Sequence, residues 1–212
     1  MDLAEVVRIM SDPRTMFGVH LCWGAYGFWL PNDPRGSGST EVWAPELRPF
    51  GPATFVENRA KSRGRVPHDR KRRLEAKKHL LRPAVLFTGI QARAVARGFA
   101  HLLAEVKIPI YACTVLPDHV HLVVGSSAIP ATILKSRLKQ HATRRLKEEK
   151  IHPFQQLLDE EGAVPKCWQR DGWTVYLFDD QRVRQTIRYV EDNPLKEGKK
   201  KQNWSFVTPF ES

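Results

Sequence analysis

The feature that most constrains this chain is the run Leu116-Pro117-Asp118-His119-Val120-His121-Leu122-Val123-Val124. Alternate residues of a strand point to the same face, so His119 and His121 stand side by side while Val120 faces the other way. Burying two neighbouring imidazoles costs free energy unless something binds them, and a divalent metal ion is a natural partner. Alternatively, one histidine is a satisfied polar group and the other faces water. The metal hypothesis therefore needs a third ligand and a reactive group.

A second segment, Arg188-Tyr189-Val190-Glu191-Asp192-Asn193-Pro194, supplies both. It lies in a predicted helix over Asp180–Asp192, which Asp179 or Asp180 can cap. Apolar residues at i, i+4 and i+7 form the buried stripe of this helix, namely Val183, Ile187 and Val190.

Tyr189 and Asn193 lie one helical turn apart, on a line with Arg182 at the edge of that stripe. This spacing suits a nucleophile beside a metal ligand. Tyr189 taken alone is better explained as a half-buried packing residue. Pro194 disfavours the α region for Asn193, so we expect the helix to end there, which makes the amide a less secure ligand than the histidines.

Together these motifs resemble the HUH superfamily of single-strand nucleases, in which two histidines flank one hydrophobic residue. More narrowly, they are similar to the single-tyrosine transposases and their REP-associated relatives. Two further runs, Trp23–Gly36 and Trp204–Val207, also match, so the resemblance extends from about residue 17 to the C-terminus, with the motifs in the family's order. It departs at Pro31–Pro67, a long segment that matches nothing we can assign.

The resemblance implies a metal-dependent transposase that cleaves and rejoins single-stranded DNA. Tyr189 would attack the phosphodiester and form a 5′-phosphotyrosine, and His119, His121 and Asn193 would hold Mg²⁺ or Mn²⁺. The implied partner is single-stranded DNA with a hairpin, such as a REP-like element or an insertion-sequence end. The protein would act as a monomer or a homodimer.

The order strand, helix, hairpin, helix, strand, helix predicts an α+β fold, an antiparallel sheet with helices packed on one face. The resemblance implies a ferredoxin-like core with the histidines on a central strand, open to the face where the tyrosine helix docks. We expect residues 1–212 to form one domain. Residues 31–67 would be an irregular insertion, since they contain six prolines and four glycines, and residues 195–212 would be a basic tail.

The formal net charge of +11 points to an anionic partner, because the basic residues are clustered. Ten Lys or Arg face only two acidic residues between Arg59 and Lys78, and further clusters follow on the predicted helix over Pro130–Lys150 and after Tyr189. The alternative is an ordinary solvated surface. The residues predicted to contact DNA are Arg70, Arg72, Arg73, Lys135, Arg137, Lys139, Arg144, Arg145 and Arg182.

Three cysteines, Cys22, Cys113 and Cys167, lie far apart without a C-x-x-C motif, so neither a disulfide framework nor a zinc knuckle is indicated. No run approaches 18 apolar residues, and we expect a cytoplasmic protein that does not bind membranes.

Two other function classes stay open. A non-catalytic DNA- or RNA-binding regulator derived from a transposase would keep the fold and the basic surface. An RNA-end-processing enzyme could use the same scaffold. The presence of both histidines together with Tyr189 and Asn193 favours catalysis, since a protein that only binds has no physical need for all four.

Overall fold

The computed structural model of the chain describes residues 16–33, 39–54, 69–157, 160–161 and 163–211. The sequence also predicts a short helix at residues 2–10, and these residues lie outside the described ranges. The elements are β1 (Gly18–Gly24), the 3₁₀ helix η1 (Pro45–Phe50), α2 (Arg70–Lys78), α3 (Gly89–Glu105), β2 (Ile110–Val115), β3 (His119–Gly125), α4 (Ala131–Glu148), β4 (Trp173–Leu177) and α5 (Asp180–Lys196).

Four strands form one sheet in the order β2-β3-β1-β4, and every neighbouring pair is antiparallel. The chain order β1-α3-β2-β3-α4-β4 on this sheet is the split βαβ arrangement of ferredoxin-like folds. The predicted α+β fold with an antiparallel sheet is confirmed. The histidine strand β3 is central, as expected.

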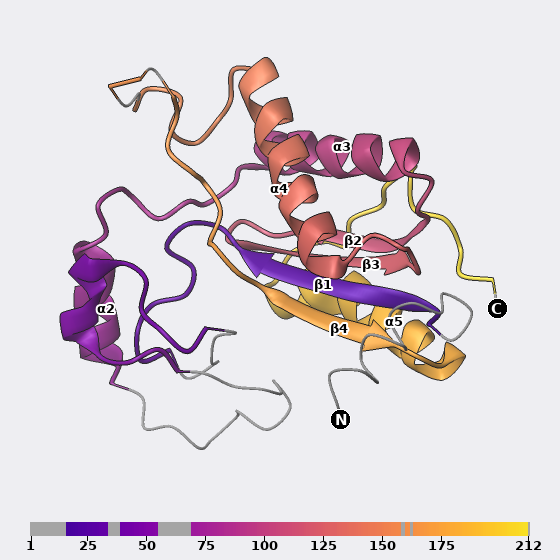
Figure 1. Cartoon of the computed structure of the whole chain (residues 1–212), viewed down its shortest axis with the longest axis horizontal. Coiled ribbons are helices and arrows are strands. Elements are labelled where there is room, and N and C mark those ends of the chain that lie inside the picture. Colours follow the sequence, from indigo (N-terminus) through magenta and orange to yellow (C-terminus); the bar gives the residue numbers. More distant parts are fainter. Residues whose placement is uncertain (1–15, 34–38, 55–68, 158–159, 162, 212) are drawn as a thin grey trace.

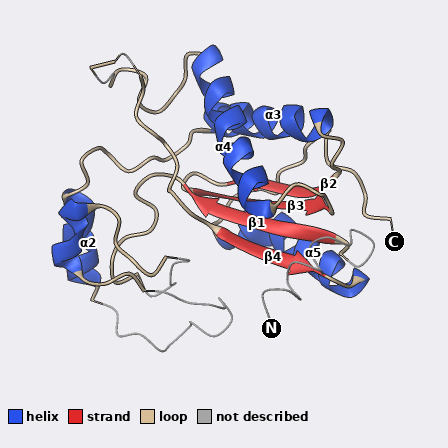
Figure 2. Ribbon diagram, viewed as in Figure 1, coloured by secondary structure: helices blue, strands red, loops and turns tan. Residues whose placement is uncertain are grey.

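Helices α3 and α4 cover one face of the sheet, and α5 lies behind the opposite face (Figures 1 and 2). Helices α3 and α4 are therefore the helices predicted to pack on one face. Helix α5 lies on the opposite face, where the resemblance implies that the tyrosine helix docks. The larger core lies under α3 and α4, where Trp23 and Leu122 meet Phe99. A smaller core under α5 comprises Ala112, Val123, Leu177, Val183 and Val190.

Helix α3 begins with a full capping box between Thr88 and Gln91. Its predicted inward residues are completely buried, namely Val95, Phe99, Leu102 and Leu103. Gly98 allows close contact with α4, because a Cβ there would lie 2.7 Å from Cα of Ala142. The absence of a side chain at this residue therefore sets how closely the two helices approach.

Helix α5 continues past the expected end at Asn193 and runs to Lys196, with Pro194 inside it. Proline lacks an N–H and leaves the carbonyl four residues earlier, that of Val190, without its helical donor. The hydroxyl of Thr114 on β2 donates to this carbonyl at 2.7 Å instead. The prediction was wrong because a tertiary hydrogen bond replaces the local one.

The insertion is less irregular than predicted, since its described part contains η1. Helix α2, capped by Asp69, is tied to the insertion through Arg72, which donates to the carbonyl of Pro49. The residue pattern also predicts a short strand over residues 84–88 and a first strand from Val19 to Leu30, and both predictions are wrong. Residues 84–88 form no strand, and β1 ends at Gly24.

The C-terminal segment follows the exposed edge of β2. The side-chain amide of Gln202 bonds both the N–H and the carbonyl of Val115, and Trp204 donates to the carbonyl of Cys113. This contact covers a sheet edge that would otherwise be open to pairing with another chain. Among the described residues, no helix combines the length and apolar character needed to cross a membrane.

Candidate functional site

The site lies on the α5 face of the sheet, where β1, β2 and β3 place polar side chains next to one another. Cys22 and Thr114 are the register partners of His121 on its two sides, so their side chains share its face. His119 is 7% exposed and His121 is completely buried. Because side chains alternate along β3, both histidines face the side of the sheet on which α5 packs, as expected.

Asp118 fixes the orientation of His119. Its carboxylate lies 2.7 Å from Nδ1 of His119, so that nitrogen carries the proton and donates. The lone pair of His119 is then on Nε2, which is the arrangement of carboxylate–histidine–metal triads. Phe28 stacks on the imidazole at 4.8 Å between ring centroids, in space left by Gly24, where a Cβ would lie 2.6 Å from the Phe28 ring.

His20 was missed by the sequence analysis and contacts the second histidine. Its Nε2 lies 3.0 Å from Nδ1 of His121, and the two rings stack at 5.2 Å. Cys22 approaches the other ring nitrogen of His121, with Sγ 3.8 Å from Nε2. His20-Leu21-Cys22 has the same alternation as His119-Val120-His121, and this signal could have identified the pair.

Tyr189 lies above these imidazoles, with its ring edge-on to His121 at 5.7 Å and to His20 at 6.1 Å. It is 36% exposed, so part of the residue is accessible to solvent. The ammonium of Lys196, two turns further along α5, lies 4.0 Å from the centre of the Tyr189 ring. The structure therefore brings the predicted nucleophile and both predicted histidines together.

Asn193 is buried, and its side-chain nitrogen Nδ2 has no hydrogen-bond partner among the described residues. In the sequence it lies between two residues that contact the site. The carbonyl of Val190 accepts a hydrogen bond from Thr114, and the carboxylate of Glu197 lies near His119. Glu197, Asp118 and His119 each offer a ligand atom within 4.8 Å of the others. Glu197 was missed because the helix was expected to end four residues earlier.

Helix α4 does not present its charges as predicted. Lys135 and Lys139 point into the protein, where their ammonium groups bond backbone carbonyls between Gln169 and Gly172. Burial lowers the pKa of Lys139 to about 8. These two lysines hold a turn that lines a cavity of about 200 Å³ beside Trp29 and Trp43, and they are not free to bind phosphate.

The other predicted DNA-binding residues differ in how exposed they are. Arg144 and Arg145 pair with glutamates of their own helix, and α4 packs on the face opposite the histidines. Arg73 contacts the buried carboxylate of Asp33 at 3.4 Å. Arg70 and Arg182 are exposed. Arg182 lies on α5, the same helix as the predicted nucleophile Tyr189.

The fold and this site define a ferredoxin-like domain in which a histidine pair on a central strand faces a tyrosine on a covering helix. No family model and no curated protein matches the chain. Among solved structures, a REP-associated tyrosine transposase bound to a REP hairpin is 12% identical, with a TM-score of 0.46 over 91% of this chain and 76% of the other. A protein of Deinococcus radiodurans R1 provisionally described as a transposase is 13% identical, with a TM-score of 0.39 over 84% and 90%.

Proposed function

We propose that the protein is a transposase-type enzyme that cleaves and rejoins single-stranded DNA through Tyr189, with hairpin-containing DNA as its substrate. The observation that carries the proposal is the contact between Asp118 and His119, because it leaves a lone pair on Nε2 of a buried imidazole beside the tyrosine helix. A histidine held only for packing has no need of this tautomer.

The donor set suits a hard divalent cation. His119 and Glu197 each offer a ligand atom within 4.8 Å of the other and of Asp118. His121, whose ring lies 5.0 Å from that of His119, adds a second imidazole. Asn193 offers a buried amide from the same face of α5. A mixed set of imidazole and oxygen donors fits Mg²⁺ or Mn²⁺, with Mn²⁺ the more tolerant of nitrogen. When bound, the ion supplies Lewis-acid stabilisation of the charge on the substrate phosphate.

In the proposed reaction, Oη of Tyr189 forms a bond to phosphorus while the bond from phosphorus to the 3′ oxygen breaks. The phenol proton passes to water at the exposed edge of the ring, and the departing 3′ oxygen takes a proton from water. The ammonium of Lys196 stabilises negative charge that develops on the phenol. The product is a 5′-phosphotyrosine, from which a second 3′ hydroxyl can rejoin the strand without ATP.

His20 acts as a positioning residue in this scheme. For Nε2 of His121 to bind a cation, Nδ1 of His121 must carry the proton and donate to Nε2 of His20. The sulfur of Cys22, 3.8 Å from Nε2, must then move aside or join the ligand set. His20 therefore plays for His121 the part that Asp118 plays for His119. The two histidines thus have separate orienting partners: His20 lies on β1, and Asp118 directly precedes β3.

The deciding experiment is a denaturing gel of the protein incubated with a single-stranded hairpin oligonucleotide and Mn²⁺ or Mg²⁺. The wild type should form a covalent adduct that runs above the free protein, and Tyr189→Phe should form none while it still binds the DNA. Tyr176→Phe, on β4, is the matched control and should form the adduct. An adduct that persists in Tyr189→Phe would remove Tyr189 from its role, and binding without any wild-type adduct would favour a non-catalytic regulator.

A second prediction concerns His20. His20→Ala should weaken Mn²⁺ binding by about 10- to 100-fold, the usual effect of losing the partner that orients a metal ligand. His20→Gln should recover most of the loss, because its amide oxygen can accept from His121. Isothermal titration with Mn²⁺ gives both values. Equal weakening in the two variants would mean that His20 contributes packing alone.

A further inference from the structure

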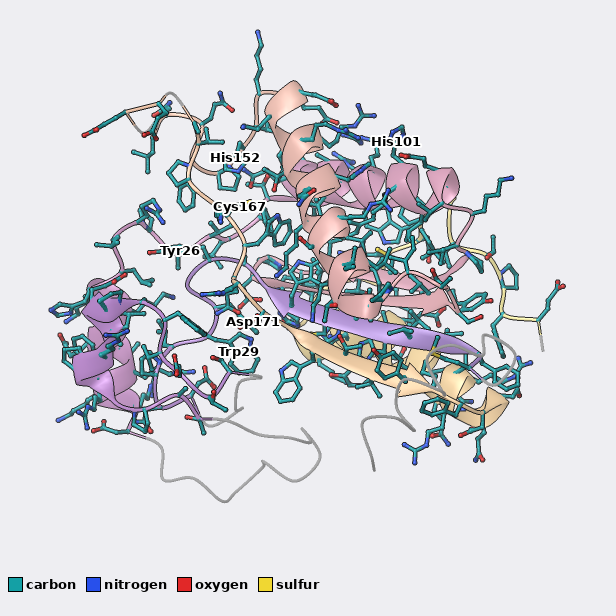
Figure 3. All side chains as sticks on the ribbon, viewed as in Figure 1. Tyr26, Trp29, His101, His152, Cys167 and Asp171 are labelled. Atoms are coloured by element: carbon teal, nitrogen blue, oxygen red, sulfur yellow. The ribbon has the colours of Figure 1, made fainter. Side chains whose placement is uncertain are left out.

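A second group of metal-ligating side chains lies on the other side of the molecule, where α3 crosses α4. His101 and Glu105 come from α3 and His141 comes from α4. One ligand atom of each lies within 4.8 Å of the other two, and the two imidazole rings are 5.8 Å apart. Figure 3 shows His101 on the side of α3 that faces away from the sheet, so this cluster is separate from the histidines under α5.

The backbone brings these side chains together. Gly98, His101 and Glu105 follow one another at i, i+3 and i+7 and form one stripe along α3. A Cβ at Gly98 would lie 2.8 Å from the carbonyl oxygen of His141, so the two helices are in backbone contact one turn before His101. Since all three ligands lie on helices, forming a site needs little ordering of the backbone.

The donor chemistry differs from that under α5. Two imidazoles and one carboxylate, with a remaining position for water, form a ligand set typical of zinc. Nitrogen-rich sets of this kind select borderline ions such as Zn²⁺ over Mg²⁺. Among the described residues, Glu105 makes no ion pair or hydrogen bond.

We propose that His101, Glu105 and His141 form a transition-metal site that binds Zn²⁺ and joins α3 to α4. The site does not depend on the proposed transposase activity. Arg144 competes for it, because its Nη2 donates to Nδ1 of His141 at 3.0 Å. Arg144 has an alternative partner in Glu148, at 3.9 Å, so it can leave His141 when the metal binds.

The site is tested with Zn²⁺ in the full-length His119→Ala/His121→Ala variant, which removes the predicted ligands under α5. Isothermal titration should give one Zn²⁺ per chain, and Zn²⁺ should raise the thermal midpoint. Adding His101→Ala and His141→Ala should abolish both effects. Glu105→Gln keeps the shape of the side chain and should weaken binding by more than about 100-fold, because losing an orienting partner alone costs about 10- to 100-fold. His79→Ala removes an exposed histidine of the α2 region and should change neither.

Arg144→Ala gives the result that a nonspecific surface effect would not produce, namely tighter Zn²⁺ binding. His101, Glu105 and Arg144 are exposed and His141 is half-buried, so the variants should melt like their parent without zinc. A single Zn²⁺ retained after loss of His101 and His141, or no Zn²⁺ bound by the parent variant, would overturn the proposal. Unchanged affinity in Arg144→Ala would overturn the competition by Arg144.

Discussion

The two faces of the sheet each carry a helix with several Lys and Arg residues, but the two helices use these charges differently. On the α4 face, Lys135 and Lys139 bond backbone carbonyls inside the protein, and Arg145 pairs with glutamates. On the α5 face, Lys196 lies against Tyr189 and Arg188 is exposed. The sequence of each helix does not reveal this difference, because the partners of the basic side chains come from other parts of the fold.

The apolar cores on the two faces of the sheet also differ, in size. The core under α3 and α4 is large and includes completely buried Trp23, Phe99 and Leu138. The core under α5 is a small group of residues beside the buried histidines. One face therefore holds most of the apolar core, while the other combines a small apolar group with buried polar side chains.

The largest expected difference is in stability. Leu138→Ala should lower the free energy of unfolding by about 2–5 kcal/mol, since it opens a cavity in the main core. Val190→Ala removes two methyl groups and should cost roughly 1.5 kcal/mol. Urea unfolding measures both. At a temperature where both variants are folded, Val190→Ala should reduce adduct formation, because Val190 adjoins Tyr189, and Leu138→Ala should not. The reverse ranking of stability would show that α5 carries the core.

Much of this arrangement could be predicted from residue patterns. Strand alternation placed His119 and His121 on one face, and the stripe of Val183, Ile187 and Val190 oriented α5 toward the sheet. His20 could not be placed with them, because its contact with His121 depends on the register between β1 and β3. Such a register joins residues about a hundred positions apart, beyond any local pattern.

Glu197 and Lys139 were beyond prediction for different physical reasons. Glu197 reaches the site only because α5 continues through Pro194, which needs the hydroxyl of Thr114 from another strand. Lys139 finds three carbonyl acceptors in a turn thirty residues further along the chain. Long side chains on a helix can turn either to solvent or to such acceptors, and helical periodicity does not distinguish the two.

A smaller effect should appear in the salt dependence of DNA binding. Neutralising Arg182, Arg188 and Lys200 to Gln should lower the log–log slope by about 2, from roughly 0.7 for each single-strand phosphate contact. The matched triple variant of Arg137, Arg144 and Arg145 should leave the slope unchanged, because α4 covers the opposite face. Salt titrations of fluorescently labelled hairpin DNA give these slopes. A lower slope for the α4 variant alone would place the DNA on that face.

The smallest expected effect is a pH dependence that belongs to the α3–α4 side alone. His152 is buried there, and its Nδ1 accepts a hydrogen bond from the backbone N–H of Phe154. Burial, with a contribution from Lys147, lowers the pKa of His152 to about 4 from 6.5. Between these values the unfolded chain binds more protons than the folded one, so stability should fall as the pH drops from 6.5 toward 4. Urea unfolding at pH 7.5, 6.0 and 5.0 should show a steeper decline for the wild type than for His152→Gln, whereas exposed His79→Gln should follow the wild type. Parallel declines in wild type and His152→Gln would show that His152 does not cause the acid sensitivity.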